Sequence, residues 1–348
     1  MTTTTTVATT TKYAKDQGAG FRNDIRRVAI IGAGGTIGKP IAQELLKTGN
    51  HTVTALTRAG SQNTLPEGIE TVQVDYDDEA GLLSALKGQD ALIITLPMNA
   101  APDTQLKIIQ AAAKAGIKYM IPNVWGCDFT NDSLMNSGLG TERHYAAFKE
   151  IEKTGVLSWV ALVCGFWYEH SVGLGRATFG LDFVEKKMVL FDDGETKINV
   201  STLAQCGRAV AKLLSLKVLP EDENDRSVTL SRWLNKPVFI SSFRVTQKDM
   251  FESWKRIAGE KDEDWTIVYE SSSERHKKGL EQMKNGDHSG FVQALYSRVF
   301  FPNGDGDYES KYGLVNELLD LPQEDLDEQT RNAKELMDRG YNYMTKRN

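Results

Sequence analysis

The chain has 348 residues, 40% of them hydrophobic and 25% charged, and its formal net charge is −6 at pH 7. This composition is ordinary for a soluble protein with a sizeable core, and the acidic balance argues against nucleic acid as the main partner. No apolar stretch approaches the roughly 18 residues of a membrane span, and the three cysteines are spaced as free thiols of a reducing compartment, so we expect a cytoplasmic protein.

The chain begins with a threonine-rich segment, and no apolar residues recur at regular spacing before Val28. Such a segment buries too little apolar surface to fold, and it lacks the apolar core of a secretory signal. We therefore predict a disordered tail over residues 1–25.

The first regular element is a strand that runs into a glycine turn and then a helix. Val28–Ile31 has no polar residue and predicts a strand covered on both faces. Gly32 permits a tight turn, and Gly35 lets a pyrophosphate approach the backbone where a helix presents its free N–H groups. Gly38 lets that helix, over residues 36–48, pack closely on the strand. The order predicts a dinucleotide-binding turn, although the spacing G-x-x-G-x-x-G differs from the commonest fingerprint.

The second strand, over residues 51–57, indicates which dinucleotide binds. A site for NAD would place an acidic residue at its end, to bond the ribose 2′-hydroxyl. Arg58 stands there instead, and its guanidinium can pair with a 2′-phosphate. A solvated surface arginine is the alternative. We therefore predict NADP(H) as the cofactor.

Strand and helix patterns then alternate as far as Cys164. Strands are expected at 71–74, 91–96, 119–121 and 157–163, and helices at 79–87, 103–115 and 141–154. This alternation predicts an α/β fold with a doubly wound parallel sheet, in which ligands bind at the carboxyl ends of the strands.

Beyond Cys164 the pattern loosens into short strands (187–191, 198–200, 237–242) and helices (201–216, 246–258). We predict an NADP-binding Rossmann domain over residues 26–165. Residues 166–348 would form a smaller α+β substrate-binding region packed on this domain. Some strands of that region could join the main sheet.

Several of these fragments together resemble one family. They are Ile31-Gly32-Ala33-Gly34-Gly35-Thr36-Ile37-Gly38-Lys39, Thr57-Arg58, Leu96-Pro97 and Pro122-Asn123-Val124-Trp125-Gly126. Over residues 26–330 the chain resembles the isoflavone-reductase-like, or NmrA-like, branch of atypical short-chain dehydrogenases. Cys164-Gly165-Phe166-Trp167-Tyr168-Glu169 is similar to fungal members, many of them linked to secondary metabolism.

The resemblance implies which residues hold the cofactor. Gly32, Gly35, Thr36 and Ile37 would contact the pyrophosphate, Arg58 the 2′-phosphate, and Leu96, Pro97 and Asn123 the remaining path of the cofactor. Asp75 would lie near the adenine or have a purely structural role.

The main difference from the family is the residue at the position of the expected proton donor. The plant members of the family carry a lysine eleven residues before the glycine that precedes the next strand, and counting back from Gly155 gives His144. An imidazole with a pKa of ~6.5 can donate a proton near neutral pH, but a partly buried structural histidine would have the same spacing.

A second candidate donor lies on the same helix. Tyr145 and Lys149 spell the Y-x-x-x-K of ordinary short-chain dehydrogenases, where the ammonium lowers the pKa of the phenol. Here the motif lies about one turn too close to the next strand, and a tyrosine and a lysine on a solvated helix face are the alternative.

Aromatic residues follow the strand ends that should meet the nicotinamide. We predict that Trp125, Phe166, Trp167 and Tyr168 line a flat substrate, with core packing as the alternative role. Tyr168 or His170 could supply the proton if the helix does not.

Two functions from different classes fit the sequence. The first is an NADPH-dependent reductase of a small, aromatic or polyketide-like molecule, acting as a monomer or homodimer. The second is a non-catalytic regulator that senses NADP(H), because the family includes such members and the lysine is missing. A third, less favoured hypothesis is an isomerase or cyclase in which the bound nucleotide has only a structural role.

Overall fold

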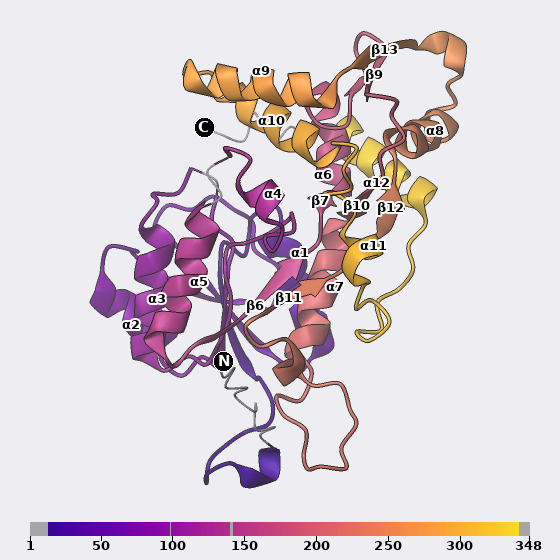
Figure 1. The fold of residues 1–348 in the computed structure, drawn as a ribbon. Helices are drawn as coiled ribbons and strands as arrows, with labels where there is room; N and C mark the ends of the chain where they lie inside the picture. Colours follow the sequence, from indigo (N-terminus) through magenta and orange to yellow (C-terminus); the bar gives the residue numbers. More distant parts are fainter. Residues whose placement is uncertain (1–12, 98, 140–141, 341–348) are drawn as a thin grey trace, which may run out of the picture.

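The computed structural model describes residues 13–97, 99–139 and 142–340 (Figure 1). Seven parallel strands form its central sheet, in the order β11-β6-β5-β4-β1-β2-β3. Their bounds are β1 Arg27–Ile31, β2 Thr52–Thr57, β3 Glu70–Gln73, β4 Ala91–Ile94, β5 Tyr119–Ile121, β6 Ser158–Val163 and β11 Lys236–Phe239. The strand order reverses between β1 and β4, as in a dinucleotide-binding sheet. The predicted doubly wound fold is confirmed, and β11 brings a strand of the C-terminal half into the main sheet.

Helices cover both faces of the sheet, as Figure 1 shows. One core lies under α1 (Gly38–Thr48) and α7 (Leu203–Leu214). The other lies under α2 (Glu79–Leu86), α3 (Thr104–Ala115) and α5 (Glu142–Thr154). Thr141, the first residue of the predicted α5, is outside the described residues.

Strand β1 shows why an unbroken apolar run predicts a central strand. Successive side chains point to opposite faces, so Val28 and Ile30 enter the first core while Ala29 and Ile31 enter the second. All four are fully buried. A polar residue at any of these positions would therefore face a core.

The C-terminal region is built on two three-stranded sheets, β12-β10-β7 and β13-β9-β8. It encloses a third core and lies over one end of the main sheet (Figure 1). Its strands are β7 Phe166–Trp167, β8 Leu181–Asp182, β9 Lys187–Phe191, β10 Ile198–Ser201, β12 Phe243–Val245 and β13 Thr266–Glu270. Its helices are α6 Tyr168–Gly173, α8 Gln247–Ala258, α9 Ser272–Lys284, α10 Ser289–Val299, α11 Tyr308–Tyr312 and α12 Leu326–Asp338, and α4 Asp132–Met135 follows β5 in the first half.

The N-terminal segment differs in part from the prediction. Residues 1–12 lie outside the described residues, but 13–25 are ordered. A short 3₁₀ helix, Ala14–Asp16, donates the Ala14 amide to the Pro220 carbonyl (2.8 Å), and Ile25 is buried in the first core. These contacts are made with chain some two hundred residues away, so local hydrophobic periodicity gives no sign of them.

Helix lengths bear on the question of a membrane span. The long helices α5, α9 and α12 have 13 residues each. Within the described ranges, no helix combines the length and the apolar character needed to cross a bilayer.

Candidate cofactor and substrate site

The glycine turn after β1 is a place where backbone segments cross closely. Gly32 has φ +82°, and a Cβ there would lie 2.1 Å from the Thr95 carbonyl oxygen. A Cβ on Gly38 would lie 2.1 Å from the Gly32 carbonyl oxygen. Both contacts are far inside van der Waals distance, so a side chain at either position would displace backbone. The glycines thus allow α1 to start directly against β1 and the end of β4.

The start of α1 is suited to bind an anion. The N-cap is Ile37, whose side chain cannot accept a hydrogen bond from the first amides of the helix. A Cβ on Gly35 would meet only the Gly32 carbonyl oxygen, at 3.1 Å, so the outer side of the turn is open among the described residues. Free N–H groups and the helix dipole favour a phosphate here. The residues therefore fit the pyrophosphate of a dinucleotide.

A loop not singled out in the sequence lies against this turn. A Cβ on Gly34 would lie 2.6 Å from the Asn63 Cβ and 3.5 Å from a Leu65 methyl group. Asn63 belongs to the connection between β2 and β3, which starts at Arg58. No spacing in the sequence connects Asn63 with Gly34, since the contact arises only when β2 docks beside β1.

Arg58 stands where a 2′-phosphate group would be recognised. It is exposed, directly after β2, and the parallel pairing of Thr57 with Gln73 brings the end of β3 beside it. Burial raises the pKa of Tyr76, and the positive charge of Arg58 partly opposes that rise, so the two side chains interact electrostatically. Asp75 accepts a hydrogen bond from the Asp77 amide (2.9 Å) in the same turn. Arg58 and Tyr76 can therefore form one edge of an adenosine 2′-phosphate site.

Asn123 joins the ends of β4 and β5. Its side-chain oxygen accepts from the Leu96 amide (3.1 Å), and its side-chain nitrogen donates to the Leu96 carbonyl (3.2 Å). Trp125 donates its indole N–H to the Ile94 carbonyl (3.0 Å). These bonds hold Leu96 and the exposed Pro97 at the carboxyl edge of the sheet. Asn123 and Trp125 thus fix the backbone at the end of β4, where the sequence predicts part of the cofactor path.

Helix α5 carries the three candidate proton donors. His144 and Tyr145 are half-buried, whereas Lys149 is exposed. The Tyr145 hydroxyl donates to the Phe129 carbonyl (3.4 Å), and burial with the nearby Asp132 raises its pKa. The paired tyrosine of short-chain dehydrogenases needs a lowered pKa, so the environment of Tyr145 acts in the opposite direction.

The three aromatic residues after β6 have different surroundings. Phe166 is half-buried and stacks on Tyr296, with ring centroids 3.8 Å apart, at the third core. Trp167 packs on the first core and meets His170 edge-on. Its indole N–H is buried and has no hydrogen-bond partner among the residues the structure describes.

Tyr168 does not line a substrate surface, contrary to the prediction. It is fully buried, and its hydroxyl shares a 2.6 Å hydrogen bond with Thr330 of α12. Burial raises its pKa, so it is also a poor acid. His170 is buried as well, and burial lowers its pKa to about 4, which keeps its ring neutral at pH 7. In a strand-to-helix turn, alternate side chains face opposite sides, and Tyr168 faces the third core.

A small cavity lies between the loop after β5 and the C-terminal region. Cys127, Phe166, Asn199 and Tyr308 are among its lining residues. Burial raises the pKa of the Cys127 thiol to about 11, so it is not a nucleophile at neutral pH. No group of three or more potential metal-ligating side chains occurs within the described part of the chain.

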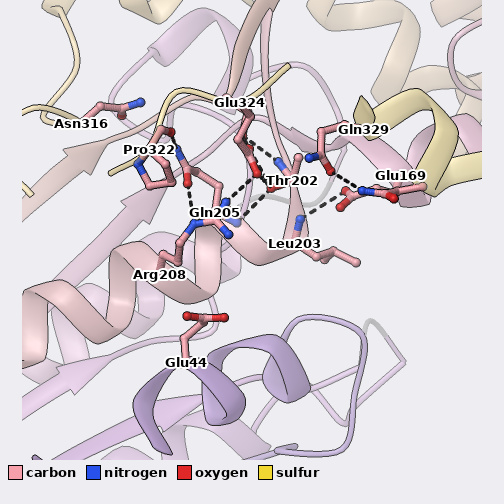
Figure 2. A network of polar contacts seen from close by, with 12 residues as sticks. Glu44, Glu169, Thr202, Leu203, Gln205, Arg208, Asn316, Pro322, Glu324 and Gln329 are labelled. Carbon is pink, nitrogen blue, oxygen red and sulfur yellow. Dashed lines mark hydrogen bonds and ion pairs between the residues drawn. The ribbon is translucent and has the colours of Figure 1, made fainter. Parts of the chain in front are cut away.

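A polar network at the start of α7 was not foreseen from the sequence (Figure 2). Thr202, the N-cap of α7, donates to both carboxylate oxygens of Glu324 (3.0 and 2.9 Å). Arg208, further along α7, donates to Glu324 at 2.5 Å. Glu169 of α6 accepts from the Leu203 amide (3.2 Å), and burial raises its pKa to about 7. Two acids and one arginine thus meet where α6, α7 and the segment before α12 converge.

Comparison with known proteins finds an NAD(P)H-binding family model and named oxidoreductases. A family model described as NAD(P)H-binding matches residues 32–182. Oxidoreductase aprR of Aspergillus flavus is 26% identical over 306 residues, covering 87% of this chain and 96% of the relative.

Two solved structures share the fold. Pinoresinol-lariciresinol and phenylcoumaran benzylic ether reductases give a TM-score of 0.70 at 20% identity, with 88% of this chain and 99% of theirs covered. An NADPH-dependent quinone oxidoreductase of Escherichia coli gives 0.60 at 20% identity, with 89% and 99% covered.

Proposed function

We propose that the protein reduces a small aromatic or polyketide-like molecule with NADPH, because it matches an NAD(P)H-binding family model, is similar to a named oxidoreductase and shares the fold of the pinoresinol-lariciresinol and phenylcoumaran benzylic ether reductases. The reducible group would be a carbonyl, an activated alkene or a quinone methide. The enzyme hypothesis is supported over the regulatory one, since the relatives are named oxidoreductases or reductases.

The observation that carries the proposal is the shape of the carboxyl edge of the sheet. The glycine turn and the uncapped start of α1 would bind the pyrophosphate, and Arg58, exposed after β2, would pair with the 2′-phosphate. Asn123 fixes the backbone of Leu96 and so orients the nicotinamide end. When bound, NADPH supplies a hydride.

His144 is the side chain we propose as the proton donor. It lies on α5 after the fifth strand of the sheet in chain order, and it is half-buried, which lets it reach a ligand while staying out of bulk water. An imidazolium nitrogen would give its proton to the reduced oxygen or carbon. Tyr145 is the lesser candidate because its pKa is raised, and Lys149 because it is exposed.

The test is NADPH oxidation with a panel of quinones, aromatic ketones and enones, menadione among them. We expect turnover by the wild type and a loss of 10²-fold or more in His144→Ala, the usual size of a general-acid effect. Tyr145→Phe and Lys149→Ala serve as matched variants on the same helix and should retain most activity. Tight NADPH binding with no turnover on any compound would overturn the reductase proposal, and full activity in His144→Ala would overturn the choice of acid.

A further inference from the structure

Glu169 is a buried carboxyl shared between two helices of different parts of the fold. It is only 7% exposed, it belongs to α6, and it accepts the first amide of α7 through Leu203 (Figure 2). Trp167, two residues earlier, packs on the first core, to which Ala33 and Ile37 of the glycine turn also belong. Glu169 therefore joins α6, which follows the predicted substrate-lining residue Trp167, to the start of α7.

Helix α7 is in turn packed along the cofactor helix α1. A Cβ on Gly207 would lie 2.7 Å from the Pro40 carbonyl oxygen, so the two backbones touch near their starts. At their far ends, His51 just after α1 and Ser215 just after α7 share a hydrogen bond of 3.0 Å. The helices thus run in the same direction, with their N-termini side by side. Packed helix axes lie about 8–10 Å apart, which sets the scale of the distance from the start of α7 to a pyrophosphate on α1.

Charged and titratable groups surround Glu169 on several sides. Burial raises the pKa of Glu169 most, and the charge of Glu324, from the segment before α12, adds to that rise. The Leu203 amide and the charge of Arg208 of α7 lower the pKa. On its own helix His170 is neutral at pH 7, and on α7 the buried thiol of Cys206 has a raised pKa, to which Glu169 and Glu324 contribute. Glu44 of α1 lies below Arg208 and pairs with Lys47 (Figure 2). From α12, the neutral amide of Gln329 faces Glu169 (Figure 2).

We propose that NADP(H) binding is coupled to proton uptake by Glu169. The phosphates of the cofactor bring negative charge to the start of α1, which lies beside the start of α7, where Glu169 accepts the Leu203 amide. Because like charges disfavour each other across a buried interface, a proton moves from solvent to the Glu169 carboxylate as the cofactor binds. The unbound protein already has a partly ionised Glu169 at neutral pH, since burial holds its pKa near 7. The inference rests on cofactor binding and not on the reduction reaction.

The experiment counts protons by titration calorimetry with NADPH in two buffers of different ionisation enthalpy. The 2′-phosphate of the cofactor also titrates near pH 6, so the quantity measured is wild type minus Glu169→Gln. We expect a difference of ~0.5 proton taken up at pH 7.5 and a value near zero at pH 5.5, where Glu169 is protonated in both states. Equal proton counts in the two proteins at pH 7.5 would overturn the inference.

Two further variants complete the design. Glu44→Gln removes a carboxyl of α1 that pairs with Lys47, and it should keep the wild-type count. Glu324→Gln removes a charge that adds to the rise in the pKa of Glu169 caused by burial, so maximal uptake should move to lower pH. An unchanged profile would contradict the proposal even if Glu169→Gln failed to fold. No substrate is present, so a failure of the reductase proposal would appear separately, as absent turnover with the proton count intact.

Discussion

Replacing Glu169 by glutamine should change how the stability of the unbound protein depends on pH. The glutamine keeps an oxygen to accept the Leu203 amide and removes the ionisation. Burial first, with Glu324 adding to it, raises the pKa of Glu169 from 4.5 to about 7. A carboxyl with a raised folded-state pKa holds its proton more tightly in the folded than in the unfolded chain. Between these two pKa values the folded state therefore binds more protons, and its stability falls as pH rises.

The size of the effect follows from the shift. About 2.5 pKa units at 1.36 kcal/mol each gives a loss of about 3 kcal/mol, absent below pH 4.5 and complete above pH 7. Glu169→Gln has no such loss. The amide changes the free energy of unfolding by a constant amount at every pH. Between pH 4.5 and pH 8 the free energy of unfolding of the variant, relative to that of the wild type, should therefore rise by about 3 kcal/mol.

The assay is urea unfolding followed by tryptophan fluorescence at pH 4.5, 5.5, 6.5, 7.5 and 8, on wild type and variant. Glu185→Gln, which removes an exposed carboxyl, is the control and should run parallel to the wild type. If the curves of Glu169→Gln and wild type stay parallel over this range, Glu169 is ionised at ordinary pH and the reasoning about its burial is wrong.

Three other expectations concern single sites. Arg58→Ala should weaken NADPH binding by about 10–100-fold, as expected for the loss of one charge-assisted bond to phosphate. NADH binding should stay unchanged. Equal losses of affinity for both cofactors in fluorescence titrations would show that Arg58 does not bind the 2′-phosphate. Gly38→Ala should destabilise the protein by about 1–3 kcal/mol and reduce NADPH affinity, because its Cβ would overlap the Gly32 carbonyl; a wild-type melting temperature would show that the turn can open. Tyr168→Phe should lower the free energy of unfolding by about 1 kcal/mol, because the hydrogen bond to Thr330 is lost, and should leave the KM for substrate unchanged. A large rise in KM would show that Tyr168 contacts the substrate after all.

Some residues of the candidate site could be predicted from the sequence, and others could not. Gly32, Gly35 and Arg58 could be named from the sequence as candidate cofactor residues because a turn and a strand end are local features with a fixed chemical use. The surroundings of Tyr145 and Tyr168 could not, because burial and the Phe129 and Thr330 partners depend on which face each residue presents. The network at α7 left no signal, since Glu169, Thr202 and Glu324 are far apart in the chain and none belongs to a recognisable motif.

What the sequence determined by itself is the Rossmann half: the alternation of apolar strands and amphipathic helices, the turn that Gly32 and Gly38 permit, and the arginine after β2. These follow from spacing within a few residues, where backbone geometry and hydrophobic periodicity act directly. Only the tertiary structure decided that α7 lies parallel to α1, that residues 13–25 pack on a distant loop, and that Glu169 is buried at a shared helix start. Those outcomes depend on contacts between segments distant in the chain, whose burial and charge no local pattern encodes.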